Sequence, residues 1–163
     1  MKMVIINKSL LFVFIILIIC GCATAPNPNR VAQRNSAIFQ APKDKVWSLL
    51  VAEIAQKYPV QVVEKDSGLI TTQFVQMPVG FNNSKIENYI FPPSRFLATW
   101  EGLRMNMQII VSETNPAVTT VAINAHYEAF ESNVSKSWIV ATSNGSVENG
   151  ILTTVELKLG LKK

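Results

Sequence analysis

Two stretches in the second half of the chain alternate between apolar and polar residues with a period of two. In residues 101–111 the odd positions from 103 onward are apolar and most even positions are polar. A similar alternation runs through residues 121–129, after a break at Asn115-Pro116. Because successive side chains of a strand point to opposite faces, the pattern predicts an antiparallel sheet with one dry and one wet face. The positions assigned to the dry face are Leu103, Met105, Met107, Ile109, Val111, Val121, Ile123, Ala125, Tyr127 and Ala129.

Two other stretches repeat their apolar residues at three- and four-residue spacing, which predicts amphipathic helices. The first begins near Pro42, because proline suits the first helical turn, and it ends before Pro59. The second follows the residues Ser143-Asn144-Gly145 near the end of the chain. Each helix needs a surface against which to bury its apolar face.

Shorter elements complete the predicted fold. β-Branched runs at residues 61–65 and 69–75 flank the turn Asp66-Ser67-Gly68 and predict a hairpin, and residues 36–40 are typical of a short first strand. Two amphipathic helices and a half-dry sheet are satisfied together when both helices pack on a single face. We therefore expect an α+β fold of the helix-grip type, an antiparallel sheet with a first and a C-terminal helix packed on one face.

Residues 76–95 do not fit this compact pattern. The segment combines prolines and a glycine with several large apolar residues, and loops of this length without structure are uncommon and often functional. One interpretation is a short helix over residues 85–91 that fills a gap in the core. The other is a lid or a partner-docking loop, for which the candidate contact residues are Met77, Phe81, Tyr89 and Phe91.

The N-terminus predicts export rather than a folded element. Lys2 and Lys8 are followed by ten uninterrupted apolar residues, 10–19. A transmembrane helix needs about 20 apolar residues, whereas a positive start and a short apolar core describe a secretory signal peptide.

The end of this run, Ile19, Cys20, Gly21 and Cys22, resembles the bacterial lipoprotein signal. The resemblance implies cleavage after Gly21 and lipid attachment at Cys22. Lipidation at Cys20 would place the bulky Ile19 at the cut site, and a disulfide is disfavoured because cysteines one residue apart cannot easily bridge. Ala23, where Asp would favour retention in the inner membrane, favours the periplasmic face of the outer membrane in a host with two membranes.

These predictions divide the chain into a signal peptide (1–21), a lipidated cysteine with a flexible tether (22–35) and one helix-grip domain (36–163). Loss of Lys2 and Lys8 with the signal peptide lowers the formal charge from +4 to +2. No basic cluster suggests nucleic acid as a partner. Both cysteines are consumed by export and lipidation, so we expect no disulfide, cysteine-bound metal or cofactor in the domain.

The chain resembles BamC, the C component of the outer-membrane barrel-assembly machinery, in three segments: FQAPKDKVWSLL, VVEKDSGLITTQF and WIVATSNGSVENGIL. The resemblance covers roughly residues 39–159 and implies a helix-grip fold with a non-enzymatic accessory or scaffolding role at the outer membrane. BamC has two such domains after a long N-terminal segment that binds its partner lipoprotein. This chain has room for one domain and a short tether, so neither that contact nor any functional residue is carried over.

Groups suited to catalysis are few. His126 is the only histidine, and the sequence has no HExxH, G-x-S-x-G or paired-cysteine motif. If the two long strands pair, Arg104, His126 and Glu128 meet on the wet face, where a carboxylate can orient an imidazole. The alternative is a solvated ion pair with no catalytic role.

We therefore expect a binding protein and not an enzyme: a lipid-anchored accessory or scaffold in envelope assembly, with the membrane and an envelope protein as partners. The alternative is a carrier or sensor of a small apolar ligand or lipid held between the helices and the sheet. This alternative depends on aromatic residues that exceed the needs of the core stripes, although they can equally be core. They include Trp47, Trp100, Trp138, Phe74, Phe96 and Phe130.

Overall fold

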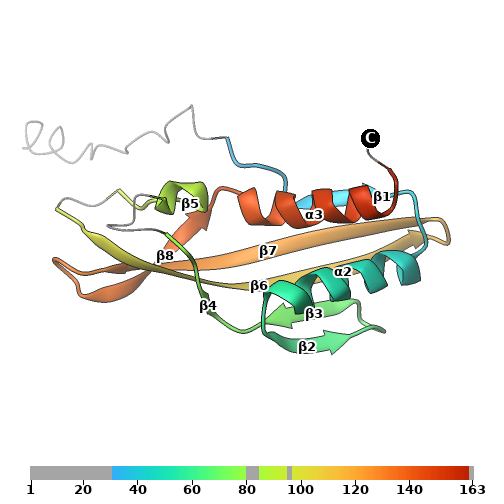
Figure 1. Cartoon of the computed structure of the whole chain (residues 1–163), viewed down its shortest axis with the longest axis horizontal. Helices are drawn as coiled ribbons and strands as arrows, with labels where there is room; N and C mark the ends of the chain where they lie inside the picture. Colours follow the sequence, from blue (N-terminus) through green and yellow to red (C-terminus); the bar gives the residue numbers. More distant parts are fainter. Residues whose placement is uncertain (1–30, 80–84, 95–96, 162–163) are drawn as a thin grey trace, which may run out of the picture.

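The computed structural model describes residues 31–79, 85–94 and 97–161, which form an α+β fold (Figure 1). An open antiparallel sheet of eight strands carries one early and one C-terminal helix, which confirms the predicted fold class. The predicted signal peptide (1–21), the predicted lipidation site Cys22 and the loop residue Phe81 lie outside the described residues. The elements are β1 Ser36–Phe39, α2 Lys43–Lys57, β2 Val60–Glu64, β3 Leu69–Thr72, β4 Val75–Gln76, the 3-10 helix η2 Ile86–Asn88, β5 Ile90–Phe91, β6 Trp100–Asn115, β7 Val118–Glu131, β8 Ser137–Ser143 and α3 Ser146–Lys158.

The two longest strands form the spine of the sheet. β6 and β7 pair antiparallel along almost their whole length, from Trp100 opposite Glu131 to Asn115 opposite Val118. β3 and β4 pair with the free edge of β6, while β8 and β1 share the free edge of β7. The predicted alternation is confirmed, because odd-numbered residues of both strands are buried on the helix side through most of the pairing.

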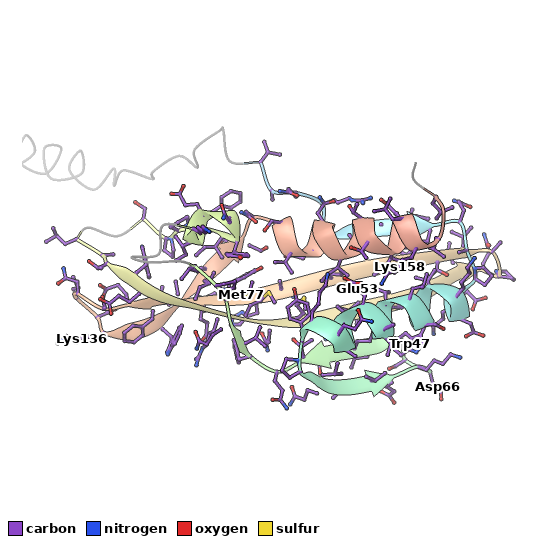
Figure 2. All side chains as sticks on the ribbon, in the orientation of Figure 1. Trp47, Glu53, Asp66, Met77, Lys136 and Lys158 are labelled. Carbon is purple, nitrogen blue, oxygen red and sulfur yellow. The ribbon has the colours of Figure 1, made fainter. Side chains whose placement is uncertain are left out.

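The two helices close the dry face of the sheet. Leu50 of α2, Leu152 of α3 and Tyr127 of β7 are fully buried between the layers. Glu53 of α2 joins the helices, because it accepts a 2.8 Å hydrogen bond from Lys158 of α3 and also pairs with Lys57 (Figure 2). Burial by itself would raise the pKa of Glu53, but the two ammonium groups outweigh it and hold the pKa below its ordinary value.

The structure differs from the sequence prediction at two strands. The run predicted as one strand over residues 69–75 divides into β3 and β4, because Gln73 leaves the ladder and donates its backbone N–H to Pro59 O at 2.9 Å. The sequence does not indicate β8, because its central residues, 138–141, are all apolar and show no alternation. β8 nevertheless pairs with residues 127–131 of β7 and widens the sheet.

The described part of the 76–95 segment closes one end of the core. Ile86 of η2 and Ile90 of β5 are buried, and Met77 and Tyr89 pack against the same core. β5 pairs with the end of β8, and the Asn144 side chain donates a 2.8 Å hydrogen bond to Glu87 O. The predicted short helix is therefore a single 3-10 turn followed by a two-residue strand, and both contribute to the core.

The last residues of the segment predicted to be a tether contact α3. The Arg34 guanidinium donates hydrogen bonds to Asn149 at 2.8 Å and to Glu156 at 2.6 and 2.7 Å. Gln33 N donates to Asn144 O at 2.8 Å. Gly145, with φ of +79°, lies so close that a Cβ atom there would overlap the backbone of Gln33. The chain is therefore fixed to the domain from residue 33 onward.

A buried carboxyl lies beneath the first turn of α3. Glu148 is 2 % exposed, and its Oε1 accepts a 2.6 Å hydrogen bond from Ser143 Oγ. Its Oε2 and the buried Tyr127 hydroxyl have no hydrogen-bond partner among the described residues. Burial raises the pKa of Glu148 above its ordinary value, because the interior solvates a carboxylate poorly.

This cluster predicts that Glu148→Gln stabilises the protein increasingly as the pH rises. A carboxyl group whose pKa is raised by folding contributes fully to the free energy of unfolding below its ordinary pKa. That contribution is lost as the pH rises through the folded-state pKa and the buried group ionises. Glutamine keeps an acceptor for Ser143 and does not ionise. We expect nearly equal free energies of unfolding at pH 4 and a gain of about 1–3 kcal/mol at pH 8, the cost of a buried unpaired polar group. Urea unfolding at both pH values measures the difference, and an equal gain at both would contradict a titrating Glu148.

Candidate functional site

The face of the sheet opposite the helices is the candidate site, and we call it the outer face. It consists of the even-numbered residues of β6 and β7 with their neighbours on β1, β3 and β8. The helices pack against the other face, where the odd-numbered residues are buried. The outer face is exposed in the part of the chain that the structure describes, and it presents both polar and large apolar side chains. The most exposed apolar ones are Ile38, Phe74, Ile110 and Val140.

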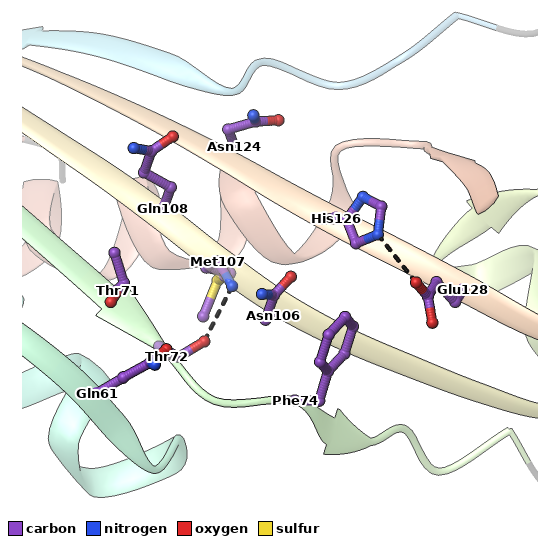
Figure 3. Close-up of a pocket in the computed structure, with 10 residues that line it drawn as sticks. All are labelled: Gln61, Thr71, Thr72, Phe74, Asn106, Met107, Gln108, Asn124, His126 and Glu128. Atoms are coloured by element: carbon purple, nitrogen blue, oxygen red, sulfur yellow. Dashed lines mark hydrogen bonds and ion pairs between the residues drawn. The ribbon is translucent and has the colours of Figure 1, made fainter.

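A groove of about 500 Å³ runs across the outer face (Figure 3). β2, β3, β6 and β7 contribute to it, together with Phe74 from the short link between β3 and β4. The volume falls within the range of about 300–1,000 Å³ that is typical of ligand sites. Its lining residues are Gln61, Thr71, Thr72, Phe74, Asn106, Met107, Gln108, Asn124, His126 and Glu128.

Four neutral amides line the groove: Gln61, Asn106, Gln108 and Asn124, which we call the amide group. The register places Gln108 directly opposite Asn124, and Asn106 directly opposite His126. Within the described ranges, the four side-chain amides form no hydrogen bond with the protein. Each amide has two N–H donors and a carbonyl acceptor. This side of the groove therefore offers both hydrogen-bond donors and hydrogen-bond acceptors, and it carries no charge.

A charged cluster closes one end of the groove, and we call it the arginine cluster: Phe74, Arg104, His126, Glu128 and Trp138. Arg104 Nε donates a 2.6 Å hydrogen bond to Glu128 Oε2, and His126 Nε2 lies 3.3 Å from Glu128 Oε1 (Figure 3 for the histidine). The guanidinium carbon lies 4.3 Å from the centre of the Trp138 ring and 4.7 Å from that of Phe74. Both are within the range of cation–π attraction.

Gly102 on β6 lies beneath the aromatic part of this cluster. Gly102 is opposite Phe130, which in turn pairs with Trp138 on β8. The Trp138 ring lies over Gly102, where an added Cβ atom would be in ordinary van der Waals contact with it at 3.4 Å. The Phe130 and Trp138 rings also contact one another, with centroids 5.4 Å apart.

The ion pair also determines the protonation of the cluster's carboxyl group. Burial by itself would raise the pKa of Glu128, but hydrogen bonds and charge from Arg104 and His126 hold it below the ordinary value. Glu128 is therefore a carboxylate at neutral pH, and its charge is compensated by Arg104. The groove presents little net charge to a ligand.

The prediction that Arg104, His126 and Glu128 meet on the wet face is confirmed by the register and the contacts. One of the two interpretations of residues 76–95 is a lid or partner-docking loop with Met77, Phe81, Tyr89 and Phe91 as its candidate contact residues. Met77 and Tyr89 pack against the core, Phe91 is half-buried in β5, and Phe81 lies outside the described residues.

The aromatic residues singled out from the sequence divide between the two faces of the sheet. Trp47 is buried in the core, whereas Phe74 and Trp138 lie on the outer face, on the opposite side of the sheet from the helices. Between the helices and the sheet, the large side chains are buried against one another. The amide group was not singled out from the sequence, although its β6 and β7 members occupy even positions of the same alternation.

The described residues contain no group of three or more His, Cys, Asp or Glu side chains that could hold a metal ion. Across the same residues, no helix has both the length and the apolar character to cross a bilayer. No protein-family model matches the sequence, and no curated protein matches it.

The arginine cluster predicts a measurable coupling between Arg104 and Glu128. We expect a double-mutant cycle of Arg104→Ala and Glu128→Gln to give a coupling energy of about 1 kcal/mol at pH 7 in low salt, as for partly exposed ion pairs. Because the pKa of Glu128 is lowered, its contribution is present above the ordinary pKa and is lost as the pH falls through the folded-state value. Chemical unfolding at pH 7 and in acid measures the cycle.

Arg104→Lys is the matched control, because it keeps the charge but loses the planar group that contacts the rings. A coupling energy near zero between Arg104 and Glu128 at pH 7 would show that solvent screens the ion pair completely.

Proposed function

We propose that the protein is a lipoprotein anchored at Cys22 to the periplasmic face of the outer membrane, where it acts as a non-enzymatic accessory or scaffold in envelope assembly. It docks an envelope protein on its outer face. The observation that carries this proposal is the exposure of large apolar side chains beside the groove: Val140, which lies opposite Glu128, is 64 % exposed, and Phe74, which lines the groove, is 42 % exposed. Exposed apolar surface with a polar rim is typical of protein interaction sites.

The arrangement of the sheet supports docking on this face. The helices already bury the odd-numbered side of β6 and β7, so the even-numbered side does not serve the core. The face nevertheless carries two aromatic rings packed on an arginine, and aromatic residues and arginine are enriched at the centres of protein interfaces. A face with no partner would be expected to carry mostly charged residues.

The contacts of Arg34 with α3 limit how far the domain can move from the anchor. Gln33, where the chain becomes fixed to the domain, is eleven positions after Cys22. A fully extended chain of that length spans at most about 40 Å. The proposed anchor therefore keeps the outer face within reach of partners at the membrane surface.

The anchor is tested by Cys22→Ser. We expect the variant to leave the membrane fraction, because no acyl chain can be attached through the serine. Cys20→Ser is the matched control and should remain in the membrane, since residue 20 departs with the signal peptide. Cell fractionation followed by immunoblotting measures both. A Cys22→Ser protein that stays in the membrane pellet would exclude this lipid anchor.

Docking is tested by crosslinking in intact cells, gentle extraction and mass spectrometry of the captured proteins. We expect capture of envelope-assembly proteins by the wild type and a loss of at least about tenfold for Val140→Glu, because a charge on the outer face must be desolvated on binding. The matched control is Leu157→Glu on α3, which is 55 % exposed on the helix side and should capture as the wild type does.

If Val140→Glu captures these proteins as well as Leu157→Glu and the wild type do, the outer face is not the interface. Recovery of the protein alone, with a stoichiometric apolar molecule beyond its own anchor, would favour the carrier function instead.

A further inference from the structure

The spacing of polar side chains in the groove matches the repeat of an extended peptide. Asn106 and Gln108 are two residues apart on β6, and Asn124 and His126 are two apart on β7. Same-face residues of a strand repeat every two residues, about 6.7 Å. The side chains of an extended polypeptide that point to one side repeat at the same interval, and so do its backbone amides.

From this match we infer that the groove binds an extended, uncharged polypeptide segment through that segment's backbone amides. This inference rests on the proposed function and specifies the partner's form: a stretch of envelope protein held before it folds. A segment laid along β6 and β7 meets Gln108 and Asn124 at one level of the sheet, and Asn106 beside His126 two residues further along. Each side-chain amide can donate to a peptide C=O and accept from a peptide N–H.

Side chains make these contacts, because the bound segment lies on the face of the sheet. Beneath it, β6 and β7 pair with one another, and β3 pairs with β6 at residues 108–110. Binding on the face differs from the edge pairing by which many sheets bind peptides. Recognition by the amide group therefore depends little on the sequence of the bound segment.

Charge and shape favour an uncharged segment with an apolar residue. Arg104 and Glu128 neutralise one another, so the groove offers no unpaired charge to a charged peptide side chain. The Phe74 ring is 42 % exposed at the end of the groove and lies 6.0 Å from the His126 ring. It offers an apolar side chain of the segment a surface on which to pack.

The test uses the full-length protein in lipid nanodiscs and a fluorescent, end-capped peptide of about twelve residues, alternating Thr and Ala with one central Leu. Fluorescence anisotropy measures its affinity. A second peptide carries N-methyl groups on alternate amides, which remove backbone donors and leave the side chains unchanged. We expect the unmodified peptide to bind and the N-methylated one to bind at least about tenfold more weakly, because each lost hydrogen bond costs about 0.5–1.5 kcal/mol.

The protein variant for the test is Asn106→Ala/Gln108→Ala/Asn124→Ala. These side chains form no hydrogen bond within the described chain, so we expect an unchanged melting temperature and at least about tenfold weaker peptide binding. Gln56→Ala is the matched control, because Gln56 is an exposed amide on α2 at the helix side. It should bind the peptide as the wild type does.

Three results would overturn the inference: no binding of the unmodified peptide, equal binding of the N-methylated peptide, or full affinity of the triple variant. A neutral chitin hexasaccharide is included as a competitor, and tight binding of that sugar in place of the peptide would assign the groove to a glycan. Capture of envelope proteins that is lost only in Val140→Glu would leave the proposed function standing even if peptide binding fails.

Discussion

The antiparallel pairing of β6 with β7 is the constraint on which the rest of the molecule depends. Because the two strands pair directly, residues opposite one another share a face along the whole length. One side of the pair is therefore apolar enough to bury two helices, and the other carries Arg104 beside Glu128 and Asn106 beside His126. A slip of one residue between the strands would separate these partners and move apolar residues into solvent. Core and candidate site are thus fixed by one register.

The two faces of the sheet differ in how many of their polar groups form hydrogen bonds or ion pairs within the protein. On the helix side, Glu53 and two lysines join α2 to α3, and Ser143 holds the buried Glu148. On the outer face the charges are compensated within the arginine cluster, whereas the amide group has no protein partner among the described residues. The first set of interactions stabilises the fold, and the second leaves hydrogen-bonding capacity open. This division supports a protein that acts by binding.

Specific hydrogen bonds fix the N-terminal segment and the β7–β8 turn to the domain. Arg34 fastens the N-terminal segment to α3, and the close approach at Gly145 brings the same segment against the start of that helix. At the far end of the pair, the Glu131 carboxylate accepts hydrogen bonds from the backbone N–H groups of residues 133–135 and holds the β7–β8 turn. Backbone hydrogen bonds to the ionised form lower the pKa of Glu131 to about 2, so the turn remains organised from acid to neutral pH.

The sequence by itself determined the α+β class, both helices, the wet and dry sides of the long strands and the meeting of Arg104, His126 and Glu128. These features follow from periodicity, which is local and repeats along the chain. It could not identify β8, whose central residues are all apolar, and it left open whether residues 85–91 fill the core or form a docking loop. Only the tertiary structure decided that Phe74 and Trp138 converge on one arginine across three separate segments and that the amides line one groove. Such convergence depends on which strands become neighbours, and neighbours distant in sequence leave no periodic signal.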